Sequence, residues 1–293
     1  MLEPPALKDK PAASTRQWRI VASKLLRHRG FVLGLVIMLV VLLAAVVGLL
    51  GAVGDPLKMN YQARFHGLSA DFPFGADRYG RSIFTRVTVG AHLSLLIGTS
   101  VVVLTAVFGG LVGAIAGYFS RFDGVIMRCM DALMAFPPLM LAIVMAAALG
   151  SGLLNLIIAL AITYTPRTGR IVRAAVLSVR SAEYIESARL SGAGDCRIIL
   201  RHILPNCMAP LVVDLTFVFA YAILAEAALS FLGVGPPPPA PTWGNIIAEG
   251  RDYIVDAPWI SIFPGLLIAF TVLGLNLLGD GLRDVLDPRL VTA

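Results

Sequence analysis

The chain has 293 residues, of which 57% are hydrophobic and only 14% charged, and its formal net charge is +6. A soluble globular domain carries about 25% charged residues, so the composition excludes an ordinary soluble protein and indicates an integral membrane protein. In such a protein the excess of basic residues concerns orientation in the bilayer, and we expect no nucleic-acid partner. The cysteines are irregularly spaced and predict neither a disulfide framework nor a zinc site.

The first part of the chain is basic and then apolar. Residues 1–30 predict a cytoplasmic tail in which residues 18–28 form an amphipathic helix on the bilayer surface, the alternative being a solvated basic tail. Residues 31–53 are uninterruptedly apolar and long enough to cross a hydrocarbon core of about 30 Å, so they predict the first transmembrane helix. Residues 54–90 are polar and predict an extracytoplasmic loop.

Residues 91–282 hold the remaining apolar segments and predict a membrane core. Gly109, Gly113 and Gly117 recur in its first segment, and small residues at such spacing allow helices to approach closely. We expect the second to sixth spans at 93–119, 125–149, 153–164, 209–232 and 259–278.

Prolines interrupt two of these segments. Pro137 and Pro138 predict a kink in the third span, and their functional interpretation is a hinge that opens and closes a pathway. Pro166 and the arginines that follow it are expected to lead the fourth span out of the bilayer. Residues 283–293 predict a short cytoplasmic C-terminal tail.

The distribution of basic residues predicts the orientation. Six spans place both termini on the same side, and most of the 24 lysines and arginines fall in segments on that side. The exceptions are Lys58, Arg64, Arg78, Arg81, Arg86 and Arg251. Because positive charge accumulates in cytoplasmic loops, the sequence predicts an all-α integral membrane protein with six transmembrane helices and both termini in the cytoplasm.

One long polar interval, residues 181–206, separates the fourth and fifth spans. It predicts a short amphipathic helix around Tyr184, which Gly192 then breaks. A second amphipathic piece over 197–204 is expected to stop at Pro205. The topology places this interval in the cytoplasm, where it suits docking to a soluble partner.

The sequence offers little catalytic chemistry. The segment 75–82 nearly matches the phosphate-binding loop GxxxxGK[ST], with Arg81 in place of lysine. That loop requires a buried strand before it and a helix after it in a soluble domain, whereas this segment lies between two spans on the outer side. The histidines are scattered and show no metal-ligand spacing. We therefore expect a transport subunit rather than an enzyme, with no cofactor and no metal bound by this chain.

Two acidic residues lie in the fifth span, where charge is costly and suggests function. Asp214 and Glu226 are about 18 Å apart along a helix and cannot act together directly. Asp214 is placed to pair with a nearby arginine, and Glu226 lies towards the outer half and faces a polar pathway. The alternative for both is helix packing or positioning of a gate.

The polar interval carries a signature of three residues, a glycine and a Leu-Pro pair. Its members are Glu186, Ser187, Ala188, Gly192, Leu204 and Pro205. It resembles the EAA motif of ABC importer permeases, in which this loop is the coupling helix that fits a cleft on the cytoplasmic ATPase. The resemblance implies that these residues and Tyr184 couple to the ATPase. The chain departs from the motif at Ser187, where alanine is usual, and at His202, where isoleucine is usual.

Other segments narrow the resemblance to the peptide/nickel importer branch and, within it, to the shorter "C" type of permease. They are Pro73 to Arg81 (PFGADRYGR), Ala225 to Gly233 (AEAALSFLG) with Trp243-Gly244, Gly279 to Asp284 (GDGLRD), and Leu286 to Pro288 (LDP). With residues 91–282 as the permease core, the resemblance implies import of di- or oligopeptides across the bacterial cytoplasmic membrane. It further implies a heterodimer with a second permease, two cytoplasmic ATPase subunits that bind ATP and Mg, and an extracytoplasmic solute-binding protein.

Three other interpretations stay open at this point. The same architecture imports nickel or a metal chelate. A self-contained channel or secondary transporter would need pore-lining charge or inverted repeats, and neither is evident in the sequence. An intramembrane enzyme would need paired catalytic residues at one depth.

Overall fold

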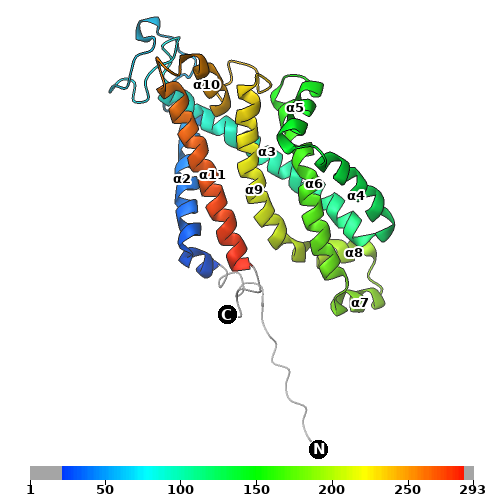
Figure 1. Ribbon diagram of the computed structural model, residues 1–293. Helices are drawn as coiled ribbons and strands as arrows, with labels where there is room; N and C mark the ends of the chain where they lie inside the picture. Colours follow the sequence, from blue (N-terminus) through cyan, green and yellow to red (C-terminus); the bar gives the residue numbers. More distant parts are fainter. Residues whose placement is uncertain (1–21, 287–293) are drawn as a thin grey trace, which may run out of the picture.

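The computed structural model describes residues 22–286, and Figure 1 shows them as a bundle of long helices with shorter helices at each end. Residues 22–286 contain no β-strand, only one isolated bridge between Ala76 and Ser82. The helices are α2 (Arg29–Leu49), α3 (Ile83–Tyr118), α4 (Ser120–Met134), α5 (Pro138–Leu149), α6 (Leu153–Arg180), α7 (Glu183–Leu190), α8 (Asp195–Ile198), α9 (Leu204–Phe231), α10 (Trp243–Gly250) and α11 (Trp259–Leu286).

Four helical segments among residues 22–286 are long and apolar enough to cross a membrane: α2, α3, the segment 195–231 that ends in α9, and α11. The pair α4 and α5 would make a fifth as one broken span. Helix α6 is not among them, because its second half carries a series of arginines. Of the expected amphipathic helix over 18–28, residues 22–27 are helical, whereas residues 18–21 and residues 287–293 of the expected tail lie outside the described residues.

The expected kink in the third span is a complete break. Helix α4 ends at Met134, α5 begins at Pro138, and the two axes differ by 92°. Pro137 precedes the first turn of α5 and Pro138 occupies it, where a missing backbone N–H costs no helical hydrogen bond. The two prolines therefore start a new helix rather than bend an existing one.

Two helices extend beyond the expected spans. Helix α3 begins at Ile83, inside the segment 54–90 expected as loop, because the Ser82 hydroxyl accepts a hydrogen bond from the Thr85 N–H and caps the helix (3.4 Å). Helix α6 does not end near Tyr164 but continues through Pro166 to Arg180.

The extension of α6 is possible because its arginines meet carboxylates on neighbouring helices. The pairs are Arg167–Asp214, Arg170–Asp131 and Arg173–Asp123. A guanidinium that is paired need not leave the helix bundle for bulk water, so arginine-rich sequence does not end the helix here. The acidic partners lie 39 to 50 residues away in the chain, which is why the sequence pattern did not reveal them.

Close backbone contact fixes α3 against α6, as the glycine spacing predicted. A Cβ added at Gly113 would lie 2.4 Å from the carbonyl oxygen of Gly169, and one at Gly117 would lie 2.7 Å from Val176 Cβ. Figure 1 shows α3 running obliquely behind α9 and α6. Side chains larger than hydrogen at these positions would force the two helices apart.

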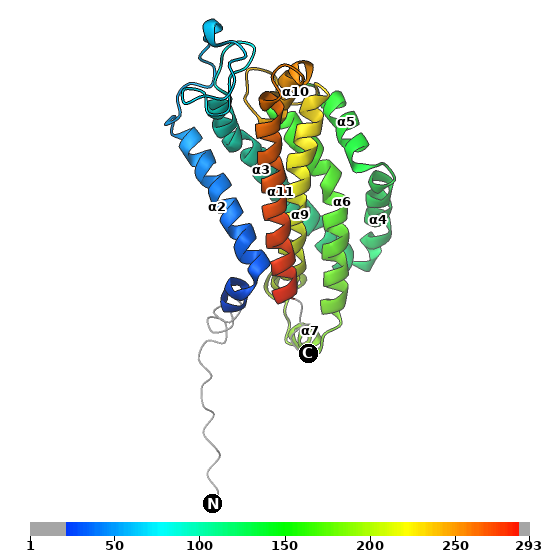
Figure 2. The same cartoon turned by 60° about the vertical axis from the view of Figure 1, so that its left-hand side comes forward.

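The start of α2, the end of α11 and the short helix α7 all lie at the same end of the bundle (Figures 1 and 2). The His28 Nε2 atom lies 3.3 Å from Asp284 Oδ2, and this contact joins the start of α2 to the end of α11. Helix α10 and the loop over 50–82 lie at the opposite end. We refer to these as the α7 end and the α10 end.

A buried ion network closes the α10 end. Arg81 Nε contacts Asp77 Oδ2 at 2.6 Å, and Arg81 Nη2 contacts Glu249 Oε2 at 2.6 Å. Arg86, which is fully buried, bridges the same two carboxylates at 3.0 and 2.9 Å. Burial alone favours the neutral acid, but the hydrogen bonds and charges of Arg86 and Arg81 outweigh it and hold the pKa of Glu249 below its usual range. The network joins the outer loop, α3 and α10.

We predict that Glu249→Gln lowers the stability of the folded chain by about 3 kcal/mol at pH 7, because two buried arginines lose a charged partner. The folded-state pKa of Glu249 lies below its unfolded value of about 4.3. The stabilisation that the Glu249 carboxylate provides is therefore complete at a pH above its unfolded-state pKa. It is lost as the pH falls through the folded-state pKa. Thermal unfolding of the purified protein in detergent, followed from pH 7 to pH 3, should show the gap between wild type and variant closing on acidification.

The exposed pair Arg251–Asp252 at the same end supplies the control. Its side chains are 55% and 69% exposed, so Asp252→Asn should change stability by less than about 1 kcal/mol. A gap between wild type and Glu249→Gln that is unchanged at low pH contradicts the prediction.

Candidate functional site

The loop between α6 and α9 lies at the α7 end and is built on a glycine turn. Helix α7 ends in a Schellman motif, in which the Ala193 N–H donates to the carbonyl of Ala188 (3.1 Å) and the Gly192 N–H donates to that of Arg189 (3.0 Å). Gly192 has a φ of +83°, a conformation that strains residues with a Cβ. The predicted break at Gly192 is confirmed, and the reason is conformational, since a Cβ there would meet no other atom.

The second half of the loop differs from expectation. Pro205 does not stop a helix; it stands in the first turn of α9, where its missing N–H is tolerated. A π-helical turn over Ile199–Ile203 precedes it and leads from α8 directly into α9, so that the Leu204 N–H bonds to the carbonyl of Ile199. Movement of this loop is therefore carried into α9 without an intervening flexible link.

Three isoleucines anchor the loop in the bundle. Ile185, Ile198 and Ile203 are fully buried in one cluster with Val172 and Val176 of α6. Leu204 packs against the same cluster. The loop is thereby fastened to α6 by apolar burial, and a displacement of α7 would act on that helix.

The opposite face of the loop is exposed and presents both apolar and charged groups. Leu190 is 86% exposed, Leu200 61% and Tyr184 46%. Glu186, Ser187 and Pro205 are exposed as well. Glu186 is exposed in the first turn of α7 and its carboxylate forms no hydrogen bond or ion pair with another residue in the range 22–286, so that carboxylate is available to a partner. Exposed leucines beside charges are the mixture found on protein-docking surfaces.

A polar cluster that the sequence did not predict ties the loop to α3. The Tyr118 hydroxyl, at the end of α3, donates to Asp195 Oδ1 (2.5 Å) and accepts from Arg189 Nη2 (3.1 Å). The hydrogen bond to Tyr118 raises the pKa of Arg189 above its usual value. Arg180 Nη1 donates to the carbonyls of Gly117 and Tyr118 (3.1 and 3.0 Å). We call the hydrogen bonds of Tyr118 with Asp195 and Arg189 the latch. Its residues are more than sixty positions apart, so no local sequence pattern could reveal it.

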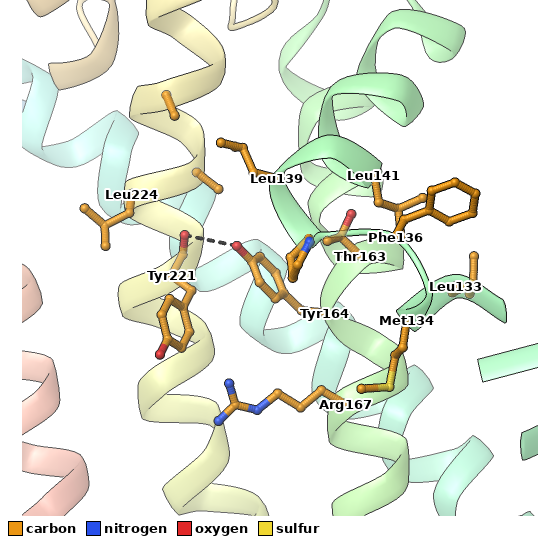
Figure 3. Close-up of a pocket in the computed structure, with 13 residues that line it drawn as sticks. Leu133, Met134, Phe136, Leu139, Leu141, Thr163, Tyr164, Arg167, Tyr221 and Leu224 are labelled. Atoms are coloured by element: carbon orange, nitrogen blue, oxygen red, sulfur yellow. Dashed lines mark hydrogen bonds between the residues drawn. The ribbon is translucent and has the colours of Figure 1, made fainter. Parts of the chain in front are cut away.

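A cavity of about 720 Å³ opens between α9, α6 and the break that separates α4 from α5 (Figure 3). Its lining is mainly apolar, with a few polar groups from α6 and α9. The Tyr164 hydroxyl donates to the carbonyl of Tyr221 (3.2 Å), and the Arg167 guanidinium carbon lies 5.7 Å from the centre of the Tyr221 ring. Pro138 lines the cavity, whereas Pro137 does not. A hinge role for the two prolines stays a prediction.

A second cavity of about 460 Å³ lies next to the first, towards the α7 end, and Arg167 lines both. Arg167 Nε is 3.2 Å from Asp214 Oδ1, and the Thr168 hydroxyl donates to Asp214 Oδ2 (2.6 Å). The expected pairing of Asp214 with an arginine is thus observed. Arg283 of α11 lines the second cavity too.

Glu226 lies on a different side of α9. It is 1% exposed, accepts a hydrogen bond from the Ser230 hydroxyl (2.8 Å) and lines neither cavity. Helix α10 packs directly against this part of α9, where a Cβ on Gly244 would lie 2.7 Å from Ala227 Cα. These surroundings favour a packing or gate-positioning role for Glu226, and its contact with a pathway stays a prediction.

Within residues 22–286 no group of three or more His, Cys, Asp or Glu side chains is arranged to hold a metal ion. What the described residues do offer is a set of membrane-length helices, two adjoining cavities along them and a loop with an exposed, partly apolar face at one end. That combination defines the membrane subunit of a transport system.

Comparison with known proteins specifies the class. Residues 106–292 match the family described as the binding-protein-dependent transport system inner membrane component, and the chain belongs to this family. It is 55% identical over 271 residues to a putative peptide transport system permease protein from Brucella abortus, covering 92% of each chain. A dipeptide transport system permease protein from Alkalihalophilus pseudofirmus is 43% identical over 93% of this chain and 90% of its own.

Two more matches extend the comparison. A glutathione transport system permease protein from Pectobacterium atrosepticum is 40% identical over 98% of this chain and 95% of its own. Among solved structures, the inward-facing MetNI methionine ABC transporter matches with a TM-score of 0.56 at 20% identity, over 68% of this chain and 95% of that chain. At that identity the last match shows a shared fold alone.

We predict that Tyr118→Phe weakens the link between the loop and α3. The change removes a donor to Asp195 and an acceptor from Arg189, and hydrogen bonds to charged groups contribute about 1.5–3 kcal/mol each. Amide hydrogen exchange over residues 183–200 should become faster, and solute transport per ATP hydrolysed should fall severalfold in the assembled transporter.

Tyr61→Phe is the control, since Tyr61 is exposed at the α10 end and its hydroxyl contacts only the sulfur of Met59 among the described residues. It should leave both measurements unchanged. If Tyr118→Phe shows the same amide hydrogen exchange and the same solute transport as wild type, Tyr118 does not link the loop to α3.

Proposed function

We propose that this chain is a transmembrane permease subunit of an ATP-driven ABC importer that moves di- or oligopeptides across the bacterial cytoplasmic membrane. The observation that carries the proposal is the loop 181–206, which is anchored in the bundle on one face and exposed on the other. The family assignment and the peptide transport names of the relatives support it.

The loop receives energy from outside the chain. ATP and Mg bind two cytoplasmic ATPase subunits, and their closure pushes on the exposed face of α7, with Glu186, Gly192 and Tyr184 at the contact. The buried isoleucines pass the displacement to α6, the π-helical turn passes it to α9, and Tyr118 passes it to α3. The two cavities lie between these helices, so relative movement of α6 and α9 opens or closes the path.

The complete transporter holds a second homologous permease, with which this chain forms a heterodimer, and an extracytoplasmic solute-binding protein that delivers solute at the α10 end. In this arrangement the chain crosses the inner membrane six times, with α4–α5 and α6 counted as spans and both termini in the cytoplasm. The joint position of α7, the start of α2 and the end of α11 at one end of the bundle supports this topology.

Peptide is favoured over nickel or a metal chelate because the relatives are named for peptide, dipeptide and glutathione transport. Cells that lack this chain should lose accumulation of a radiolabelled dipeptide, by at least tenfold, and retain accumulation of radioactive nickel. Loss of nickel uptake with normal dipeptide uptake would reverse the assignment. Uptake that needs no ATPase subunit would indicate a self-contained channel or secondary transporter.

We predict that Gly192→Asp abolishes dipeptide uptake while the protein still inserts in the membrane. The positive φ at Gly192 strains residues with a Cβ by about 1–2 kcal/mol, so the turn that orients α7 is lost. Gly192→Val should lose uptake at least as completely, because β-branched residues fit this conformation worst.

Gly194→Asp is the matched control for added charge and volume. Gly194 has a φ of −67°, precedes the first turn of α8 and has open space around its Cβ position, and aspartate is a preferred residue there. Uptake should be close to wild type. If Gly194→Asp is as inactive as Gly192→Asp, the loop rejects acidic residues in general and its backbone conformation is not the cause.

A further inference from the structure

We propose that Arg167 is a binding residue for the carboxylate of the transported solute, on the translocation path between the two cavities. This inference rests on the proposed function, since it assigns a contact to the solute that the permease moves. It names the chemical class recognised at that contact: a short peptide or another small solute that ends in a carboxylate and carries apolar groups.

The position of Arg167 is the first argument. It lies in the middle of α6 (Leu153–Arg180) and lines both the larger and the smaller cavity. A solute that passes from one cavity to the other would pass its guanidinium. A guanidinium that lines both cavities of a transport subunit is placed to contact a charged solute on its way.

The unequal exposure of Arg167 and Asp214 favours binding of an anionic group. The Arg167 side chain is 47% exposed, whereas the side chain of its partner Asp214 is 2% exposed. Asp214 lines only the smaller cavity and is held from behind by the Thr168 hydroxyl. A solute in the larger cavity therefore meets the cation rather than the anion.

The Arg167 guanidinium has donors that are not used by Asp214. Its ion pair uses Nε, and no hydrogen bond joins its Nη atoms to any residue in the range 22–286. Arginine presents its donors as a planar fork that matches a carboxylate. Asp214 and the Tyr221 ring, 5.7 Å from the guanidinium carbon, hold that fork in place, so less conformational entropy is lost on binding.

The remainder of the larger cavity suits the rest of the solute. Its volume of about 720 Å³ lies within the usual range for small-molecule sites. Met134, Phe136 and Leu224 supply apolar surface, and the Tyr164 and Tyr221 rings lie beside Arg167 (Figure 3). One charged anchor beside a large apolar surface fixes the carboxylate while accepting varied side chains, which is what a peptide permease requires.

Direct binding to the purified transporter tests the inference. The complex of both permeases and both ATPases, without solute-binding protein and without nucleotide, is dialysed against radiolabelled alanyl-phenylalanine or its C-terminal amide. Wild type should bind the free acid at least tenfold more tightly than the amide. Arg167→Gln should bind both with the affinity of the amide, and Arg167→Lys should retain part of the difference.

Arg170→Gln is a closely matched control. Arg170 lies on the same helix, is 49% exposed, pairs with an aspartate, Asp131, and lines neither cavity. Its variant should keep the wild-type preference for the acid. Size-exclusion chromatography and thermal unfolding verify that each complex is assembled.

Three results overturn the inference: equal affinity of wild type for acid and amide, including no measurable binding of either; an unchanged preference in assembled Arg167→Gln; or the same loss in Arg170→Gln. Dipeptide uptake by cells with and without this chain is measured separately. Absence of a difference there rejects the proposed function, whereas normal uptake with equal binding of acid and amide rejects the role of Arg167 alone.

Discussion

The structure depends on the compensation of charge along α6. Arg167, Arg170 and Arg173 lie on a helix that runs beside apolar neighbours, and each meets a carboxylate from α9 or α4. The three arginine side chains are 47%, 49% and 29% exposed, so each pair contributes modestly and its main effect is to set α9 and α4 against α6. The pairs also position α4, which buries no residue of its own and is attached to α6 by Asp123 and Asp131.

The same helix connects the two functional regions. The half of α6 towards the α7 end supplies Val172 and Val176 to the cluster that anchors the loop 181–206. The middle of α6 supplies Arg167 and Tyr164 to the cavities. Because α6 is also in backbone contact with α3 through Gly113 and Gly117, it cannot move without moving α3. In the proposed mechanism a push on α7 would therefore move packed helices. Rigid coupling of this kind is what an ATP-driven conformational change needs.

The α10 end is held together by buried ion pairs and a buried hydrogen bond. Arg86 and Arg81 share Asp77 and Glu249, and fully buried Trp243 donates from its indole to the carbonyl of Val87 (2.9 Å). Glu226 of α9 is buried at the same end, beneath α10. One end of the bundle is therefore closed by buried charge pairs, while the other end carries the exposed loop and its latch.

The sequence by itself determined the class of the protein, because apolar length and residue composition are local properties. It also located the polar loop 181–206 and its break at Gly192, since glycine within a helical pattern is a local signal of a turn. The start of α3 and the passage through Pro205 rest on local contacts, the Ser82 cap and the π-helical turn. The ion pairs that join α6 to α4 and α9 were decided by tertiary packing. So were the latch of Tyr118 with Asp195 and the shared position of Arg167 between two cavities. Each of these depends on groups far apart in the chain, whose charges and backbones compensate one another only once the helices are packed.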